Sequence, residues 1–108
     1  MIHKTLENNL NIIIGQNAID NWKIIDYAKS DWYWFHLKSF PSSHVILCSS
    51  NPNQYSINEA ANYCKSFTKY KNVPNIKVSY CKIRNIQKTN KPGQVTFISN
   101  KQVKNICV

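Results

Sequence analysis

The stretch Asp31-Trp-Tyr-Trp-Phe-His-Leu-Lys-Ser-Phe-Pro-Ser-Ser-His-Val-Ile-Leu47 decides the fold of this chain. Its first part, Trp32 to Lys38, is rich in aromatic residues and predicts a strand, and Val45 to Leu47 predicts a second strand. The residues Ser39-Phe-Pro-Ser42 between them are typical of a turn. The two strands therefore form a hairpin that brings its two histidines toward each other. A cluster of Trp, His and Asp side chains on adjacent strands is typical of a functional site.

The remaining segments predict an α+β domain, in which a mostly antiparallel sheet packs against two helices. Apolar residues recur at three- and four-residue spacing in the two predicted helices and alternate in the predicted strands. A serine followed three residues later by a glutamate predicts a capping box at the start of the second helix. The expected elements are a hairpin of His3–Glu7 and Leu10–Ile14, a helix from Asn17 to about Ala28, a helix capped by Ser56 with Glu59 and ending near Tyr70, a long strand Ile76–Ile86, and a final hairpin of Gln94–Ser99 and Gln102–Val108.

The positive charge is concentrated in the second half of the chain. The net charge is +9, and all five acids precede residue 60, whereas the remainder carries nine lysines, one arginine and no acid. Such an imbalance is self-repelling unless a polyanion or dissolved ions offset it, and nucleic acid is the obvious polyanion. The alternative is a solvated, highly soluble surface. The chain has thirteen lysines and one arginine. Lysine reads base edges poorly, so sequence-specific recognition of duplex DNA is not expected.

Length and composition indicate one domain, spanning residues 1–108, with one core. No apolar run approaches the roughly 20 residues that a membrane span requires, and no secretory signal pattern is visible. The cysteines are far apart and form no C-x-x-C motif, which argues against a zinc site and for reduced thiols that act as small core residues. We therefore expect no metal, no cofactor and a cytoplasmic location, in a host cell if the sequence is viral.

The order of these segments resembles the NFACT-R domain family over about Ile12 to Val103. The matching residues are Gly15-Gln-Asn-Ala-Ile-Asp-Asn21, Asp31-x-x-Trp-Phe-His36, Pro41-Ser-Ser-His-Val45, Glu59-Ala-Ala61, Val78-x-Tyr80 and Lys91-Pro-Gly-Gln-Val95. The family occurs at the end of large ribosome quality-control factors and as a short stand-alone protein. The resemblance implies RNA binding, to tRNA or rRNA, with ribosomal or quality-control proteins as further partners; one branch is linked to DNA. The sequence departs from the family at Gln16, where a basic residue is usual.

His36 and His44 have two interpretations. They are either a nucleotide-facing pair that contacts phosphate or ribose, or buried histidines held by Asp31 or by the backbone. A hydrogen bond from Asp31 to His36 would fix the tautomer of that ring. A nuclease that uses the two histidines and Asp31 is a further alternative, and it predicts cleavage that is lost on His36→Ala or His44→Ala.

The aromatic residues of the first strand alternate between the two faces of the sheet. Tyr33 and Phe35 are expected in the core. Trp34 or Trp32 remains a candidate for stacking on an unpaired base, which would contribute about 1–3 kcal/mol. A protein-docking module anchored by the same aromatic residues is the third hypothesis, and it predicts binding that survives loss of the lysine charges.

A basic loop and the strand before it are the best candidates for phosphate contacts. Lys82 and Arg84 share a strand face at two-residue spacing, and Lys88 and Lys91 flank the turn that follows. Gly93 lets the backbone of this turn approach a phosphate closely. The complete set of predicted nucleic-acid contacts is Lys82, Arg84, Lys88, Lys91, Gly93, Asn17, Trp34, His36, His44, Lys65 and Lys69, with Asp31, Asn21, Pro41 and Ser43 as structural or orienting residues.

Overall fold

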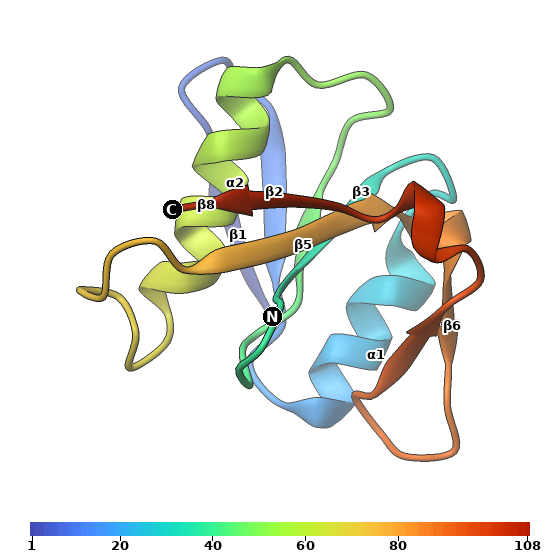
Figure 1. Cartoon of the computed structure of the whole chain (residues 1–108). Helices are drawn as coiled ribbons and strands as arrows, with labels where there is room; N and C mark the ends of the chain where they lie inside the picture. Colours follow the sequence, from blue (N-terminus) through green and yellow to red (C-terminus); the bar gives the residue numbers. More distant parts are fainter.

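The computed structural model describes all residues from 1 to 108 and contains a six-stranded antiparallel sheet with the strand order β1-β2-β4-β3-β5-β8 (Figure 1). A separate two-stranded sheet is formed by β6 and β7. The fold is therefore α+β, as predicted. The strands are β1 (Ile2–Thr5), β2 (Asn11–Ile14), β3 (Tyr33–Leu37), β4 (Val45–Leu47), β5 (Lys77–Lys82), β6 (Ile86–Lys88), β7 (Val95–Phe97) and β8 (Lys104–Cys107).

The two helices cover opposite faces of the large sheet (Figure 1). Helix α1 (Ala18–Tyr27) places Ile24 against Trp34 and Ile46, and the small β6–β7 sheet lies on this same face. Helix α2 (Gln54–Ser66) packs on the other face, where its small residues Ala60, Ala61 and Cys64 contact the sheet. No helix has the length and apolar character that crossing a membrane requires.

The central strands are largely apolar because both faces of the sheet are covered. Strand β4 is fully buried, and Ile12 to Ile14 of β2 are buried as well. Along β3 the alternation is strict: Phe35 faces the α2 core, whereas Trp34 faces the α1 core. This confirms that the set containing Phe35 is in the core, with Tyr33 packed beside it.

The predicted aromatic hairpin is confirmed. Strands β3 and β4 pair in the register Tyr33 with Leu47, Trp34 with Ile46 and Phe35 with Val45. This pairing brings His36 and His44 together, with ring centroids 5.2 Å apart at nearly a right angle. The N-terminal hairpin of β1 and β2 also forms as predicted.

Three expectations about local structure were wrong: the residue that caps α2, the residue at which α2 ends, and the length of strand β5. Asn53, and not Ser56, caps α2: its side chain accepts a hydrogen bond from the amide of Ser56, which lies one turn inside a helix that ends at Ser66. The predicted strand Ile76–Ile86 stops at Lys82, because Ile83–Asn85 turns into a 3-10 helix, η1.

The predicted C-terminal hairpin does not form. Strand β7 pairs with β6, and β8 pairs with β5 in the large sheet. A short 3-10 helix, η2 (Asn100–Gln102), carries the chain from one sheet to the other. The turn residues around Asn100 therefore mark a crossing between sheets, and not the tip of a hairpin.

The cysteines are free thiols, as expected. Cys64 and Cys81 are buried in the two cores, and burial raises the pKa of each thiol to about 11. Cys107 is exposed on the edge strand β8, so it is not the small core residue that was predicted.

Candidate nucleic-acid interface

A broad pocket of about 1410 Å³ opens on the α1 face of the sheet, at the end where the β3–β4 loop, the start of α1 and the β6–β7 turn meet. Strands β3, β5 and β8 form its floor. The turn that follows α2 contributes the opposite rim. We call it the sheet-end pocket; the residues that line it and enter the argument below are Gln16, Asn17, Ala18, Asn21, Trp34, His36, Lys38, Pro41, Ser43, His44, Lys69, Ser79, Lys91, Gly93, Phe97 and Asn105.

The floor of the sheet-end pocket is built around a buried Trp–His pair. The indole Nε1–H of Trp34 donates to Nδ1 of His44 across 3.0 Å. Trp34 is 3% exposed and Phe97 packs edge-on against it. The expectation that Trp34 stacks on a base from an exposed position is therefore not met, because its faces are occupied by His36 and by side chains of the core.

His36 lies over Trp34, with the two rings nearly parallel and their centroids 5.7 Å apart. Its Nδ1 lies 2.6 Å from the carbonyl oxygen of Leu37. A carbonyl only accepts, so this contact requires a proton on Nδ1. Burial lowers the pKa of His36, which keeps the ring neutral near pH 7.

His44 is more completely enclosed than His36. Burial, followed by the nearby His36, lowers the pKa of His44 to about 3, and a hydrogen bond with the Gly93 backbone opposes this shift. Because Nδ1 accepts from Trp34, the proton of the neutral ring is on Nε2. His44 therefore presents no acceptor nitrogen to the pocket.

The expected contact between Asp31 and His36 is absent. Asp31 precedes β3 and His36 is near its far end, so at about 3.3 Å per residue the two positions are roughly 16 Å apart. The three groups of the nuclease hypothesis, which adds His44, consequently do not converge on one reacting atom.

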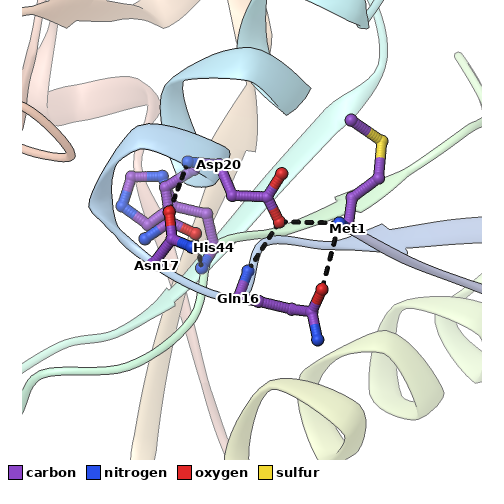
Figure 2. A network of polar contacts seen from close by, with 6 residues as sticks. Met1, Gln16, Asn17, Asp20 and His44 are labelled. Carbon is purple, nitrogen blue, oxygen red and sulfur yellow. Dashed lines mark hydrogen bonds and ion pairs between the residues drawn. The ribbon is translucent and has the colours of Figure 1, made fainter.

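The start of α1 forms one wall of the pocket and is held by a polar network (Figure 2). The side chain of Asn17 caps the helix by accepting from the amide of Asp20 at 2.9 Å. The Asp20 carboxylate accepts from the amide of Gln16 at 2.8 Å and lies 2.9 Å from the amino group of Met1. The hydrogen bond from that amino group lowers the pKa of Asp20.

Asn21 joins this wall to the hairpin. Its side-chain oxygen accepts from the backbone amide of His44 at 3.2 Å, and the carbonyl of His44 accepts from the amide of Gly15 at 3.0 Å. A Cβ at Gly15 would lie 2.0 Å from the Asn21 oxygen, so only glycine fits there. The segment from Gly15 to Asn21 therefore fixes the position of the His44 backbone through two hydrogen bonds.

The β6–β7 turn forms the second wall. Gly93 has φ +82°, and a Cβ on it would lie 2.9 Å from the Cα of Ala18. This close approach presses the turn against the first residue of α1. Lys91, in the same turn, is exposed at the rim of the pocket.

The charge on the sheet-end pocket is entirely positive. Lys38, Lys69 and Lys91 are the charged residues of its lining, which contains no Asp or Glu. Lys69 lies over the ring of Tyr70, with its Nζ 5.4 Å from the ring centroid. The three lysines come from three different loops, so the fold alone brings them to one opening.

Several of the predicted phosphate contacts lie elsewhere. Lys82 stands over the ring of Tyr33, on the α2 face. Arg84 belongs to η1, so it does not share a strand face with Lys82. Lys88 pairs with Asp26 at 2.6 Å and covers Trp22. The predicted four-residue basic face is therefore dispersed, and only Lys91 of that set lines the pocket.

Lys65 was also predicted as a contact and is instead structural. It is 9% exposed, and its ammonium group donates to the carbonyl oxygen of Val108 at 2.9 Å. The other predicted residues, Asn17, Asn21, Pro41, Ser43, His36, His44, Lys69 and Gly93, all line the pocket.

Among the pocket residues that sequence reasoning missed, four enter the argument here: Lys38, Ser79, Asn105 and Phe97. The sequence pattern extends the first strand of the hairpin to Lys38, whereas the structure places Lys38 in the loop that follows β3. Ser79 and Asn105 are cross-strand partners on β5 and β8, and the Ser79 hydroxyl donates to the Asn105 side-chain oxygen at 2.8 Å. Phe97 reaches the pocket from β7. The alternation of β5 placed Ser79 on the face opposite Val78, and this was the one available signal.

The fold and this site define a small α+β domain with a polar, positively charged pocket at one end of its sheet, a combination that suits a nucleic-acid ligand. The NFACT protein RNA binding domain family matches residues 1–99. The chain belongs to this family.

Known relatives agree with this assignment. The chain is similar to the Rqc2 homolog RqcH of Bacillus subtilis (strain 168), with 38% identity over 99 residues, which is 89% of this chain and 17% of that protein. It is 28% identical over 97 residues to the Rqc2 homolog RqcH of Streptococcus suis (strain 05ZYH33), which is 86% of this chain and 18% of that protein. The chain thus spans less than a fifth of the length of these relatives.

A solved structure shares the whole fold. It is the C-terminal part of the fibronectin/fibrinogen-binding protein from Streptococcus suis, which superposes with a TM-score of 0.90 at 25% sequence identity. The match covers 98% of this chain and 44% of that one.

Proposed function

We propose that this domain binds RNA by taking an unpaired nucleotide segment into the sheet-end pocket, with its backbone phosphates at Lys38, Lys69 and Lys91. The observation that carries the proposal is the convergence of three lysines, with no acid, on a pocket otherwise lined mostly by polar and aromatic side chains. Lysine side chains around a groove neutralise phosphates and release counterions, which is the main source of affinity for a nucleic acid.

The shape of the site supports an unpaired segment rather than a duplex. Its volume of about 1410 Å³ is somewhat larger than that of a typical small-molecule pocket, about 300–1,000 Å³, and the lining mixes amide, hydroxyl and imidazole groups. Sequence-bearing features of RNA are accessible mainly in loops, bulges and ends, where the bases are not stacked in a helix. A rigid duplex would contact only the rim.

The biological setting follows from the family. The matching relatives are Rqc2 homologs, and the resemblance of the sequence implies that tRNA or rRNA is the natural ligand. We propose that this domain supplies a non-enzymatic RNA contact in ribosome-associated quality control. The two histidines do not favour the nuclease alternative, since His44 is buried with its Nδ1 engaged by Trp34, and Asp31 lies away from His36.

The direct test is fluorescence polarisation with labelled tRNA, single-stranded RNA and duplex DNA, at about 50 and 200 mM salt. We expect binding to RNA whose log K falls with log salt at a slope of about −2, for three phosphate contacts on a single strand. Replacing Lys38, Lys69 and Lys91 with Gln should remove most of this affinity and flatten the slope.

The matched control carries the same change in charge away from the pocket. Lys4, Lys23 and Lys29 are exposed and do not line it, so their triple Gln variant should retain most of the binding. Equal losses in the two variants would mean that net charge, and not the pocket, holds the RNA. An affinity that changes neither with salt concentration nor on substitution of the pocket lysines would instead support the protein-docking hypothesis.

A further inference from the structure

One ring nitrogen in the sheet-end pocket has no partner in the protein. Nδ1 of His36 is used by the Leu37 carbonyl at 2.6 Å, and no hydrogen bond involves Nε2. Because the proton is on Nδ1, Nε2 of the neutral ring is a hydrogen-bond acceptor. His36 is half-buried and lines the pocket, so this acceptor is available to a ligand.

His44 beside it offers no comparable group. Its Nδ1 accepts from Trp34, its Nε2 carries the proton of the neutral ring, and the residue is 2% exposed. The two histidines therefore have different roles: His44 supports the structure, and His36 presents a lone pair. The stacking of His36 on Trp34 fixes the direction of that lone pair.

Polar side chains continue from His36 across the floor of the pocket, on strands β5 and β8. His36 is the register partner of Ser79, and Ser79 is the register partner of Asn105. The Asn105 side-chain oxygen accepts from Ser79, which leaves its amide N–H groups as donors. The floor thus presents an acceptor on β3 and donors on β8, about two strand spacings or roughly 10 Å apart.

A phosphate cannot be the group that meets His36. Phosphate oxygens accept hydrogen bonds, and burial lowers the pKa of His36, so the ring has no second N–H to offer near pH 7. The partner must carry an O–H or N–H. Lys91 at the rim and the adjacent Gly93 line the same pocket as His36 and His44, whose ring centroids are 5.2 Å apart. A nucleotide with its phosphate at Lys91 has its sugar within the same pocket as His36.

We propose that His36 selects RNA over DNA by accepting a hydrogen bond from a ribose 2′-hydroxyl through Nε2. This inference rests on the proposed RNA-binding function of the same pocket. The 2′-hydroxyl is the group that distinguishes RNA from DNA, and it is absent from a deoxyribose. His36 is accordingly a specificity-determining residue, and the lysines supply affinity without discrimination.

The test compares three labelled single strands of one sequence, about 12 nucleotides long, made with ribose, 2′-fluororibose or deoxyribose. The 2′-fluoro strand keeps the charge and the bases but lacks the hydroxyl donor. We expect the wild-type protein to bind the ribose strand roughly 3- to 10-fold more tightly than the other two, which is the value of one neutral hydrogen bond.

His36→Phe keeps an aromatic ring on Trp34 and removes the acceptor. It should bind all three strands equally, at the affinity that the wild type has for the 2′-fluoro strand. His36→Gln, which can place an oxygen near the position of Nε2, should restore part of the preference. His3→Phe on the exposed strand β1 is the matched control and should discriminate like the wild type.

The outcomes separate the inference from the function on which it rests. Salt-dependent binding to all three strands with equal affinity, or an RNA preference that persists in His36→Phe, would overturn the role of His36 and leave RNA binding intact. If none of the three oligonucleotides binds, the proposed function is wrong, and the inference about His36 is wrong as well.

Discussion

The indole N–H of Trp34 and Nδ1 of His44 form a 3.0 Å hydrogen bond between two side chains that are 3% and 2% exposed. The bond joins the middle of β3 to the residue that precedes β4, beneath the floor of the sheet-end pocket. A buried donor and acceptor that satisfy each other fix one arrangement of the rings, because any other arrangement leaves a polar group unpaired in the core.

Trp34→Phe should therefore destabilise the fold. The substitution keeps an aromatic face but leaves Nδ1 of His44 buried without a donor, which costs about 1–3 kcal/mol in the free energy of unfolding. Urea denaturation measures this loss as a lower midpoint.

Trp22→Phe is the matched control. Trp22 Nε1 is buried without a hydrogen-bond partner, so the same substitution there removes an unsatisfied donor. Its midpoint should fall by clearly less than that of Trp34→Phe. Equal losses would show that the size of the ring, and not the hydrogen bond, accounts for the effect.

The stability of the domain should fall as the pH drops below about 6.5. Burial lowers the pKa of His44 to about 3 from its ordinary value of 6.5. Between these values the unfolded chain binds a proton that the folded chain excludes, so the contribution of His44 is fully present above pH 6.5 and is lost toward pH 3. The expected slope is about 1.4 kcal/mol per pH unit, and the lowered pKa of His36 adds to it in the same direction.

Urea denaturation between pH 6.5 and 5, above the range in which most carboxylates titrate, isolates this effect. His44→Asn offers an amide oxygen to Trp34 without a titrating ring, and it should flatten the slope. His3→Asn changes an exposed histidine and should leave the slope as it is in the wild type. A wild-type stability that is constant over this range would contradict the buried, neutral state of His44.

Gly93→Ala should weaken both the fold and RNA binding. Gly93 has a left-handed backbone, which costs a residue with a Cβ about 1–2 kcal/mol, and the new methyl group would lie 2.9 Å from the Cα of Ala18. The turn must move away from α1 and take Lys91 with it. The thermal midpoint should drop by roughly 4–8 °C per kcal/mol. Asn90→Ala, an exposed neighbour in the same turn, should change neither quantity appreciably.

The hairpin at the centre of the fold could be predicted because its signals are local. The apolar and aromatic runs of β3 and β4 are separated by a proline-containing turn, and this suffices to place His36 beside His44. The C-terminal strands could not be predicted in the same way. Their pairing depends on which sheet edge is free, and the edge of β5 accepts β8 after the chain has crossed over through η2.

The lysines of the site illustrate the same limit. Lys82, Arg84 and Lys88 are close in sequence to Lys91, yet side-chain partners and the 3-10 turn at Arg84 direct them to other surfaces. Lys38 and Lys91 are far apart in the chain, and the fold brings both to the sheet-end pocket. Charge density along a sequence predicts a polyanionic ligand, but the surface that would meet it is determined by tertiary structure.

Substitutions at Asn17 can distinguish the contribution of the pocket wall to stability from its effect on the charge of the pocket. Its side chain caps α1 and also lines the pocket. Asn17→Ala should lower the free energy of unfolding by about 1 kcal/mol, because the amide of Asp20 loses its acceptor. Asn17→Asp keeps an acceptor and places a negative charge at the positive end of the helix, so its stability should match or exceed that of the wild type.

The Asn17→Asp substitution is also expected to weaken RNA binding. It places a carboxylate in a pocket whose only charged groups are otherwise lysines. Fluorescence polarisation should show a loss for Asn17→Asp that is larger at about 50 mM salt than at 200 mM, since salt screens the repulsion between carboxylate and phosphate. Asn17→Ser caps the helix without charge and should bind RNA like the wild type. RNA affinity that follows the stability of the three variants, instead of their charge, would mean that phosphates do not approach this end of α1.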